Sequence, residues 1–249
     1  MNFLRTRVRE KFTRTTSNPS HLAPGTVGGV TFRGFPVEAI TFYEQLEADN
    51  SRAFWQANKQ RYDELIKQPM LDLADELSDY GPFHLFRPHN DLRFSKNKPP
   101  YKTQQGAYGE SEGGTGYYMQ FSAQGLMVGA GYYAMAADQL ARFRAAVDAD
   151  ATGTELAGLV AGAERRGNRM GAIDELKTAP RGFPKDHPRI ELLRRKGLIV
   201  AKEFGAPGWI HTKAAAKRIR DTWVGVADVC RWLDAHVGPS TLPPDDRWS

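Results

Sequence analysis

Two strand-like runs joined by a tight turn restrict the folds available to this chain more than any other feature of its sequence. Residues 117–123 and 126–133 are rich in aromatic, β-branched and methionine residues, and only Gln124-Gly125 separates them. This pattern is typical of a β-hairpin. Because side chains alternate along a strand, one face of the first run is expected to carry three polar residues: Tyr118, Gln120 and Ser122.

Helical periodicity precedes this hairpin. An apolar stripe at helical spacing runs through residues 36–81 and is interrupted at Asn50-Ser51 and at Pro69, which predicts three helices, the last ending at Gly81. The glycine-rich residues 106–116 are interpreted as a loop.

Helical periodicity also follows the hairpin. The sequence predicts helices at 136–148 and 152–165, a strand at 198–204, and one long final helix capped by Thr212. We therefore expect an α+β fold, with a mostly antiparallel sheet that contains the β-hairpin and is packed by N-terminal and C-terminal helices.

The composition indicates a folded, soluble protein. The 249 residues are 41% hydrophobic and 25% charged, and no apolar run reaches the roughly 18 residues that a transmembrane helix needs. One cysteine, Cys230, excludes an internal disulfide framework and a cysteine-rich zinc site. We expect a cytoplasmic protein without a membrane span, and the sequence leaves its oligomeric state open.

The net charge of +5 is concentrated at the N-terminus, where residues 1–20 contain five Arg and Lys residues against Glu10 alone. The rest of the chain is close to neutral. We expect residues 1–30 to form a basic disordered tail and linker, residues 31–238 a single domain, and residues 239–249 a C-terminal tail.

The densest polar motif lies between Asn90 and Thr103. From Arg93 to Thr103 it holds four cations, two hydroxyls and a phenol within eleven residues. Arginine binds phosphate or carboxylate with a planar fork, and lysine supplies a mobile positive charge. The motif therefore suggests a site for a small anionic ligand, and its candidate binding residues are Arg93, Ser95, Lys96, Lys98 and Lys102, with Tyr101 as a candidate proton donor.

A structural role for this motif remains an alternative. Asp91 and Arg93 could pair on a strand surface, and lysines near a sheet edge protect against aggregation. Arg93 could equally bind a carboxylate elsewhere in the fold.

A second cluster surrounds His187. Asp186 is interpreted as a helix N-cap with Pro188 in the first turn. Alternatively, His187 could act as a general acid or base beside Arg181, which would contribute to binding the anion. The histidines show no metal-binding spacing, and the chain has no phosphate-binding loop or nucleophile elbow, so neither a metal nor another cofactor is predicted.

The central motif resembles a known family. The run Asp91-Leu92-Arg93-Phe94-Ser95-Lys96, with Lys98 and Pro100-Tyr101-Lys102, is similar to the domain-of-unknown-function family 2461 of uncharacterised bacterial and fungal proteins. The resemblance extends from Phe32-Arg33-Gly34-Phe35 to Phe204 and includes Pro180-Arg181-Gly182-Phe183. It implies the boundaries of the fold and no activity.

Three functions fit these patterns. The first is an enzyme or sensor for a phosphorylated or carboxylated small molecule, in which Tyr101 or His187 moves a proton. The second is nucleic-acid binding through one patch formed by the basic tail, the basic stretch 165–196 and four later residues: Lys213, Lys217, Arg218 and Arg220. Four tyrosines could stack on bases: Tyr117, Tyr118, Tyr132 and Tyr133. The near-neutral body argues against it, because nucleic-acid-binding domains usually carry a strong basic excess. The third is a partner-binding scaffold without catalysis.

Overall fold

A computed structural model describes residues 31–91 and 98–242 of the chain. The predicted N-terminal tail, residues 243–249 of the predicted C-terminal tail, and three candidate ligand-binding residues, Arg93, Ser95 and Lys96, lie outside these ranges. The expected α+β class is confirmed, because helices pack around an antiparallel sheet with the strand order β1-β2-β3-β4-β6-β5. The strands are β1 (His84–Leu85), β2 (Gln104–Glu110), β3 (Gly116–Ser122), β4 (Gly125–Tyr132), β5 (Arg169–Gly171) and β6 (Leu198–Gly205).

The predicted hairpin is confirmed as β3 and β4, which pair from Gly116–Gly131 to Ser122–Gly125. The loop expected at 106–116 is wrong over residues 106–110, because β2 continues to Glu110. Its glycines serve packing, since a Cβ atom at Gly109 would lie 3.1 Å from the ring of Phe83. Glycine in a strand often marks such a close approach.

The N-terminal helices are α1 (Glu38–Ala48), α2 (Arg52–Tyr62) and α3 (Gln68–Glu76). Ser51 caps α2 as expected, and its Oγ accepts a hydrogen bond from the backbone N–H of Phe54 at 3.0 Å. The helix break expected at Pro69 is wrong. A π-helical turn, η1 (Asp63–Lys67), joins α2 to α3 without interruption, so Pro69 lies within a continuous helix, directly after the π-helical turn.

The C-terminal half contributes α4 (Ala137–Asp148), α5 (Asp150–Arg165), α6 (Ile190–Leu193), α7 (Ala214–Gly225) and α8 (Ala227–His236). The prediction of a single long final helix is therefore wrong, since the helix is interrupted at Val226, between the end of α7 at Gly225 and the start of α8 at Ala227. The predicted Asp186 cap is also wrong, because α6 begins only at Ile190 and no side chain caps it. Cys230 is buried on α8, as expected. None of the described helices has the length and apolarity needed to cross a bilayer.

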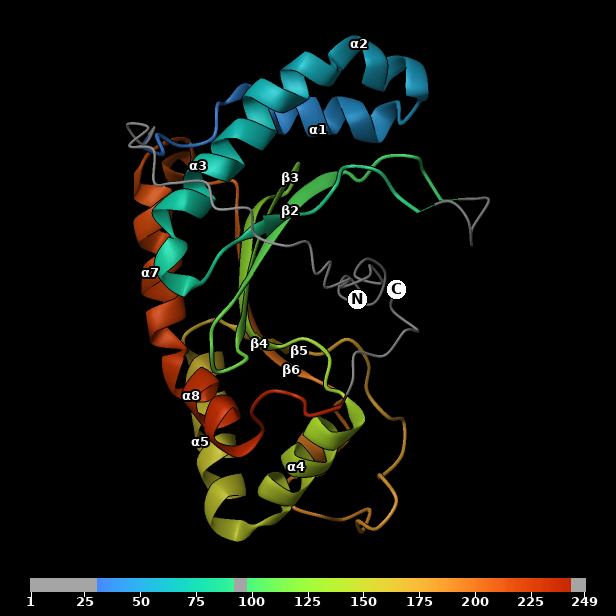
Figure 1. The fold of residues 1–249 in the computed structure, drawn as a ribbon, viewed down its shortest axis with the longest axis vertical. Coiled ribbons are helices and arrows are strands. Elements are labelled where there is room, and N and C mark those ends of the chain that lie inside the picture. The colour runs from blue at the N-terminus through green and yellow to red at the C-terminus, as the bar shows by residue number, and fades with distance from the viewer. Residues whose placement is uncertain (1–30, 92–97, 243–249) are drawn as a thin grey trace.

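The described chain has the outline of a C (Figure 1), with α1 and α2 at one end, α4 at the other, and the sheet backed by α7 and α8 between them. Helix-facing residues of the sheet form the core, for example Phe121, which stacks on Phe35 with ring centroids 4.1 Å apart. We call the opposite face of the sheet, turned toward the inside of the C, the inner face. It is defined by alternate strand residues: Gln104, Gly106, Tyr108, Tyr118, Gln120, Met127 and Gly129.

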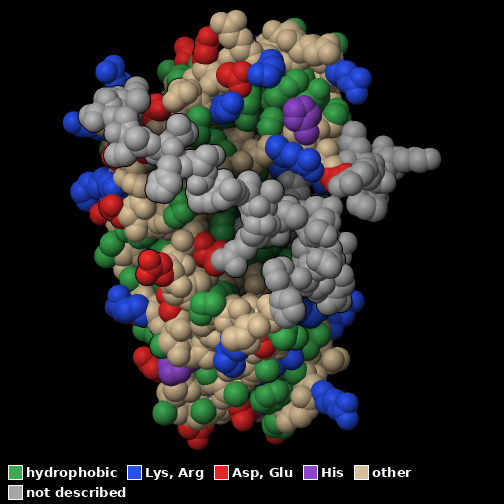
Figure 2. Space-filling model, in the orientation of Figure 1, with side chains coloured by type: hydrophobic (Ala, Val, Ile, Leu, Met, Phe, Trp, Pro, Cys, Tyr) green, Lys and Arg blue, Asp and Glu red, His purple; other side chains and the backbone are tan. Residues whose placement is uncertain are grey.

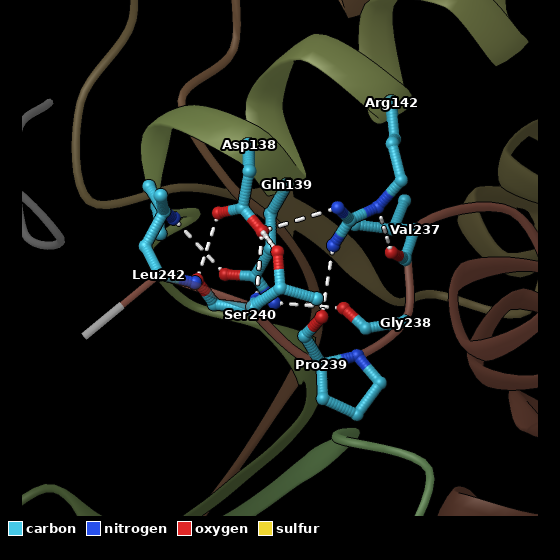
Figure 3. Close-up of polar contacts among 10 residues, drawn as sticks. Asp138, Gln139, Arg142, Val237, Gly238, Pro239, Ser240 and Leu242 are labelled. Carbon is cyan, nitrogen blue, oxygen red and sulfur yellow. Dashed lines mark hydrogen bonds and ion pairs between the residues drawn. The ribbon is translucent and has the colours of Figure 1, made fainter. Parts of the chain in front are cut away.

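A polar cluster ties the last described residues to the start of α4 (Figure 3). Ser240 Oγ and the Thr241 backbone N–H donate to the two carboxylate oxygens of Asp138 at 2.7 and 2.9 Å. Arg142 donates to Asp138 at 3.1 Å and to the carbonyl oxygen of Pro239 at 2.8 Å. These contacts close the C-terminal segment over α4.

Candidate functional site

The two described flanks of the central motif run antiparallel beside each other. The backbone N–H of Asn90 donates to the carbonyl oxygen of Pro100 at 2.9 Å, and that of Lys102 donates to Pro88 at 2.8 Å. The Asn90 side chain adds a bond to the carbonyl oxygen of Pro99 at 2.7 Å. This pairing leads the chain directly into β2, so the motif lies at the edge of the sheet.

Tyr101 is buried and faces the helices. Its ring stacks on Trp55 of α2 with centroids 4.4 Å apart and planes inclined by 11°. The side chain of Asn50 makes two hydrogen bonds to the backbone of Tyr101. Asn50 Nδ2 donates to the Tyr101 carbonyl oxygen at 3.0 Å, and Asn50 Oδ1 accepts from the Tyr101 N–H at 2.9 Å. Tyr101 therefore holds the motif against the N-terminal helices.

Lys102 lies on the other side of the strand from Tyr101. Its Nζ donates to the carbonyl oxygen of Arg87 at 2.7 Å and lies 5.6 Å from the ring centroid of Phe86. Strand alternation explains this split, because neighbouring side chains point to opposite faces. Tyr101, Thr103 and Gln105 are buried on the helix side, while Lys102 leads into the inner face.

Two tyrosines form the centre of the inner face. Tyr108 and Tyr118 are direct cross-strand partners on β2 and β3. Tyr118 donates its hydroxyl to Gln120 Oε1 at 2.9 Å, and Tyr108 donates to Glu110 at 3.1 Å. Burial, followed by the Glu110 carboxylate, raises the pKa of Tyr108, so this phenol is protonated at neutral pH. The face therefore presents hydroxyl and amide groups on an aromatic floor.

The structure does not bring His187 to this site. His187 Nε2 lies 3.2 Å from Asp148 Oδ1 at the end of α4, and its Nδ1 accepts the Arg189 N–H at 3.0 Å. Arg189 in turn donates to the carbonyl oxygens of Val147 and Asp148. The cluster satisfies carbonyl groups that the helix end leaves without partners. Figure 1 places α4 and α2 at opposite ends of the described chain.

The remaining predicted residues divide between these regions. Lys98 is half-buried in the motif flank near Tyr101, whereas Arg181 is exposed in the segment between β5 and α6. The sequence analysis did not identify Asn50, whose side chain hydrogen-bonds the backbone of the motif at Tyr101. It placed Tyr118 and Gln120 on one face of a strand but did not place Lys102 on that face. Strand parity counted back from β2 would have supplied that link.

Several of the basic residues expected to attract nucleic acid are engaged within the described part of the protein. Lys196 pairs with Asp174 and Lys217 with Asp221, each at 2.8 Å. Figure 2 shows Lys and Arg interspersed with Asp and Glu over the visible face of the described residues. Opposite charges so mixed weaken a long-range basic field.

Two of the four tyrosines expected to stack on bases face the helices instead. Tyr117 packs against Trp223 with ring centroids 5.1 Å apart, and Tyr132 is only 5% exposed. Burial and then Asp234 raise the pKa of Tyr132, whose hydroxyl lies 3.1 Å from that carboxylate. Among the described residues, no group of three or more His, Cys, Asp or Glu side chains could hold a metal ion.

Comparison with known proteins gives one match. The sequence model of the family described as "Conserved hypothetical protein (DUF2461)" matches residues 38–232, from the start of α1 into α8. This match confirms the resemblance first seen at the central motif. No curated protein and no solved structure gives a significant match.

Proposed function

The chain belongs to the DUF2461 family, and we propose that it binds a small phosphorylated or carboxylated molecule where the central motif meets the inner face. Arg93, Lys96, Lys98 and Lys102 would supply positive charge, with Ser95 and Gln120 as hydrogen-bonding groups. Charged groups of this kind bind anions through short, charge-assisted hydrogen bonds.

One observation carries the proposal. In the extended segment that leads into β2, the Tyr101 side chain lies in the core and the Lys102 side chain lies on the inner face. Lys102 is beside the ring of Phe86, and Phe86 neighbours the ring of Tyr118. Tyr101 and Asn50 then act as positioning residues, which hold the backbone next to Lys102 at the edge of a rigid sheet. Sites built on such rigid elements keep their geometry more accurately than sites on loops.

The proposal does not use His187 or Arg181. The contacts of His187 with Asp148 and Arg189 support a role at the end of α4. The proposed activity is binding, because Tyr101, the other candidate for moving a proton, is buried against Trp55.

Thermal unfolding of the full chain tests this proposal. The probes are inorganic phosphate, pyrophosphate, sugar phosphates and dicarboxylates. An anion at a hundred times its dissociation constant should add about 2.7 kcal/mol, which corresponds to roughly 5–10 °C for a chain of this size. We expect Lys102→Met to remove the shift. The matched control is Lys59→Met. It removes an exposed lysine of α2 that pairs with Asp63, and the variant should keep the shift.

Two outcomes would contradict the proposal. One is the absence of a shift with every anion, which would favour the scaffold function. The other is a shift that survives Lys102→Met, which would place the anion elsewhere. A single-stranded oligonucleotide added to the same panel tests the nucleic-acid alternative, since such binding falls steeply with added salt.

A further inference from the structure

The inner face has an aromatic row beside Lys102. Lys102 Nζ lies 5.6 Å from the ring centroid of Phe86, and Phe86 lies 6.1 Å from the ring centroid of Tyr118, with the two planes inclined by 32°. The cation and the tyrosine therefore both lie close to one phenyl ring. The two rings lie on the same face, one to each side of β2, since the Phe86 N–H bonds the carbonyl of Gly106 on β2 and Tyr118 belongs to β3, which pairs with β2 along its other edge.

Glycines let the tyrosine rings lie along the sheet instead of standing up from it. A Cβ atom at Gly106 would lie 2.7 Å from the Tyr118 hydroxyl oxygen and 3.0 Å from its ring. A Cβ atom at Gly116 would lie 2.5 Å from the ring of Tyr108. Each ring thus covers a glycine of the neighbouring strand, and the two rings lean in opposite directions. The result is an aromatic floor over the glycines of the sheet.

The polar groups of this floor are arranged in order along β2. Lys102 precedes the strand, and Glu110 ends it with its carboxylate engaged by Tyr108. Between them, Gln120 accepts the Tyr118 hydroxyl through Oε1, which assigns its amide nitrogen, a donor of two hydrogens, to the remaining side. An anion is therefore favoured at the Lys102 end, and a hydrogen-bond acceptor is favoured beside Gln120.

We infer that the anionic ligand is a nucleoside phosphate, with its phosphate at Lys102, its base stacked over Phe86 and Tyr118, and a base acceptor within reach of the Gln120 amide. This inference rests on the proposed anion-binding function and specifies its ligand class. Aromatic side chains stack on every base because each base has a π-face, and one such stack is worth about 1–3 kcal/mol. A cation one ring away from the stack suits a molecule that joins a planar ring to a phosphate.

Calorimetric titration of the full chain with three probes tests the inference: AMP, ribose 5-phosphate and inorganic phosphate. We expect AMP to bind at least about fivefold more tightly than ribose 5-phosphate, the ratio that corresponds to the weakest of these stacks. Tyr118→Leu should remove this advantage while leaving the ribose 5-phosphate affinity unchanged. Tyr118→Phe keeps a ring and should retain it. Trp209→Leu, which removes an aromatic ring near α7, is the control and should behave as wild type.

The outcomes separate the two proposals. If AMP and ribose 5-phosphate bind equally, or if Tyr118→Leu weakens both to the same extent, the base site is refuted while anion binding stands. If none of the three probes binds, both proposals fail. Should Tyr118→Leu not fold, Tyr118→Phe and the wild-type comparison of AMP with ribose 5-phosphate still decide the question.

Discussion

The hydroxyl of Tyr62 on α2 donates a hydrogen bond to Gln105 Oε1 on β2 inside the core. Gln105 in turn donates through Nε2 to the carbonyl oxygens of Phe86 and Gly106, each at 2.8 Å. One amide therefore joins helix α2 to the two segments that carry the inner face. Burial raises the pKa of Tyr62, so its hydroxyl remains a donor at any physiological pH.

Tyr62→Phe should destabilise the protein by about 1–3 kcal/mol, because it leaves the buried Gln105 Oε1 without its donor. Equilibrium unfolding in urea measures the change. The double variant Tyr62→Phe with Gln105→Leu removes both partners and should recover part of the loss. An unchanged midpoint in Tyr62→Phe would show that Gln105 is satisfied in another way.

Asn50→Ala should increase local opening of the central motif and leave the β3–β4 hairpin protected. The substitution removes both hydrogen bonds to the Tyr101 backbone, at an expected cost of about 1–3 kcal/mol. Amide hydrogen exchange should accelerate at Tyr101 and Lys102 while the β3–β4 hairpin keeps its protection. Asn58→Ala on α2, which loses one bond to the Phe54 carbonyl, is the control and should leave exchange at Tyr101 unaffected. Equal acceleration throughout the sheet would contradict a local role for Asn50.

Two inner-face glycines should respond differently to alanine. Gly106→Ala would force a methyl group against Tyr118 and Phe86, at an expected cost of about 1–3 kcal/mol. At Gly129 the nearest atom to an added Cβ atom is 3.6 Å away, an ordinary contact, so Gly129→Ala should be neutral or stabilise by up to about 1 kcal/mol. Thermal unfolding of both variants checks this contrast. Equal effects would show that the tyrosine ring moves away without cost.

The closure of the C-terminal segment over α4 should depend on pH. The Thr241 backbone N–H and then the Ser240 hydroxyl and Arg142 hold the pKa of Asp138 well below its usual range. A carboxyl group whose pKa is lowered by folding stabilises the native state above its unfolded pKa of about 3.9, and this contribution is lost as the pH falls through the folded value.

The free energy of unfolding of wild type minus that of Asp138→Asn measures this contribution. The difference should be positive and constant from pH 7 to 5 and should shrink in more acidic solution. Asp221→Asn, which loses an exposed helical pair with Lys217, is the control and should change stability by less than about 0.5 kcal/mol. A difference between wild type and Asp138→Asn that is independent of pH would contradict the role of the ionised carboxylate.

Local sequence patterns predicted the helices and strands better than the boundaries between them. The hairpin, the Ser51 cap and the strand at 198–204 follow from alternation and capping, which act between residues close in sequence. Three of the errors fall at Pro69, Val226 and the β2 glycines. There a continuous helix tolerates a proline, a long apolar stripe is divided between two helices, and aromatic side chains require glycine within a strand.

The sequence by itself determined the α+β class, the family and the polar face of the hairpin, because each depends on periodicity or on a contiguous motif. Only the tertiary structure decided which motif residues share that face. Asn50 and Tyr101 are 51 positions apart, and their contact sets the side of the strand on which Lys102 emerges. The tertiary structure also decided that His187 lies away from the motif, because its contact with Asp148 holds the imidazole ring at the end of α4, at the other end of the C. Contacts between distant segments leave no local pattern in a single sequence, because they are chosen by how the helices and the sheet pack together.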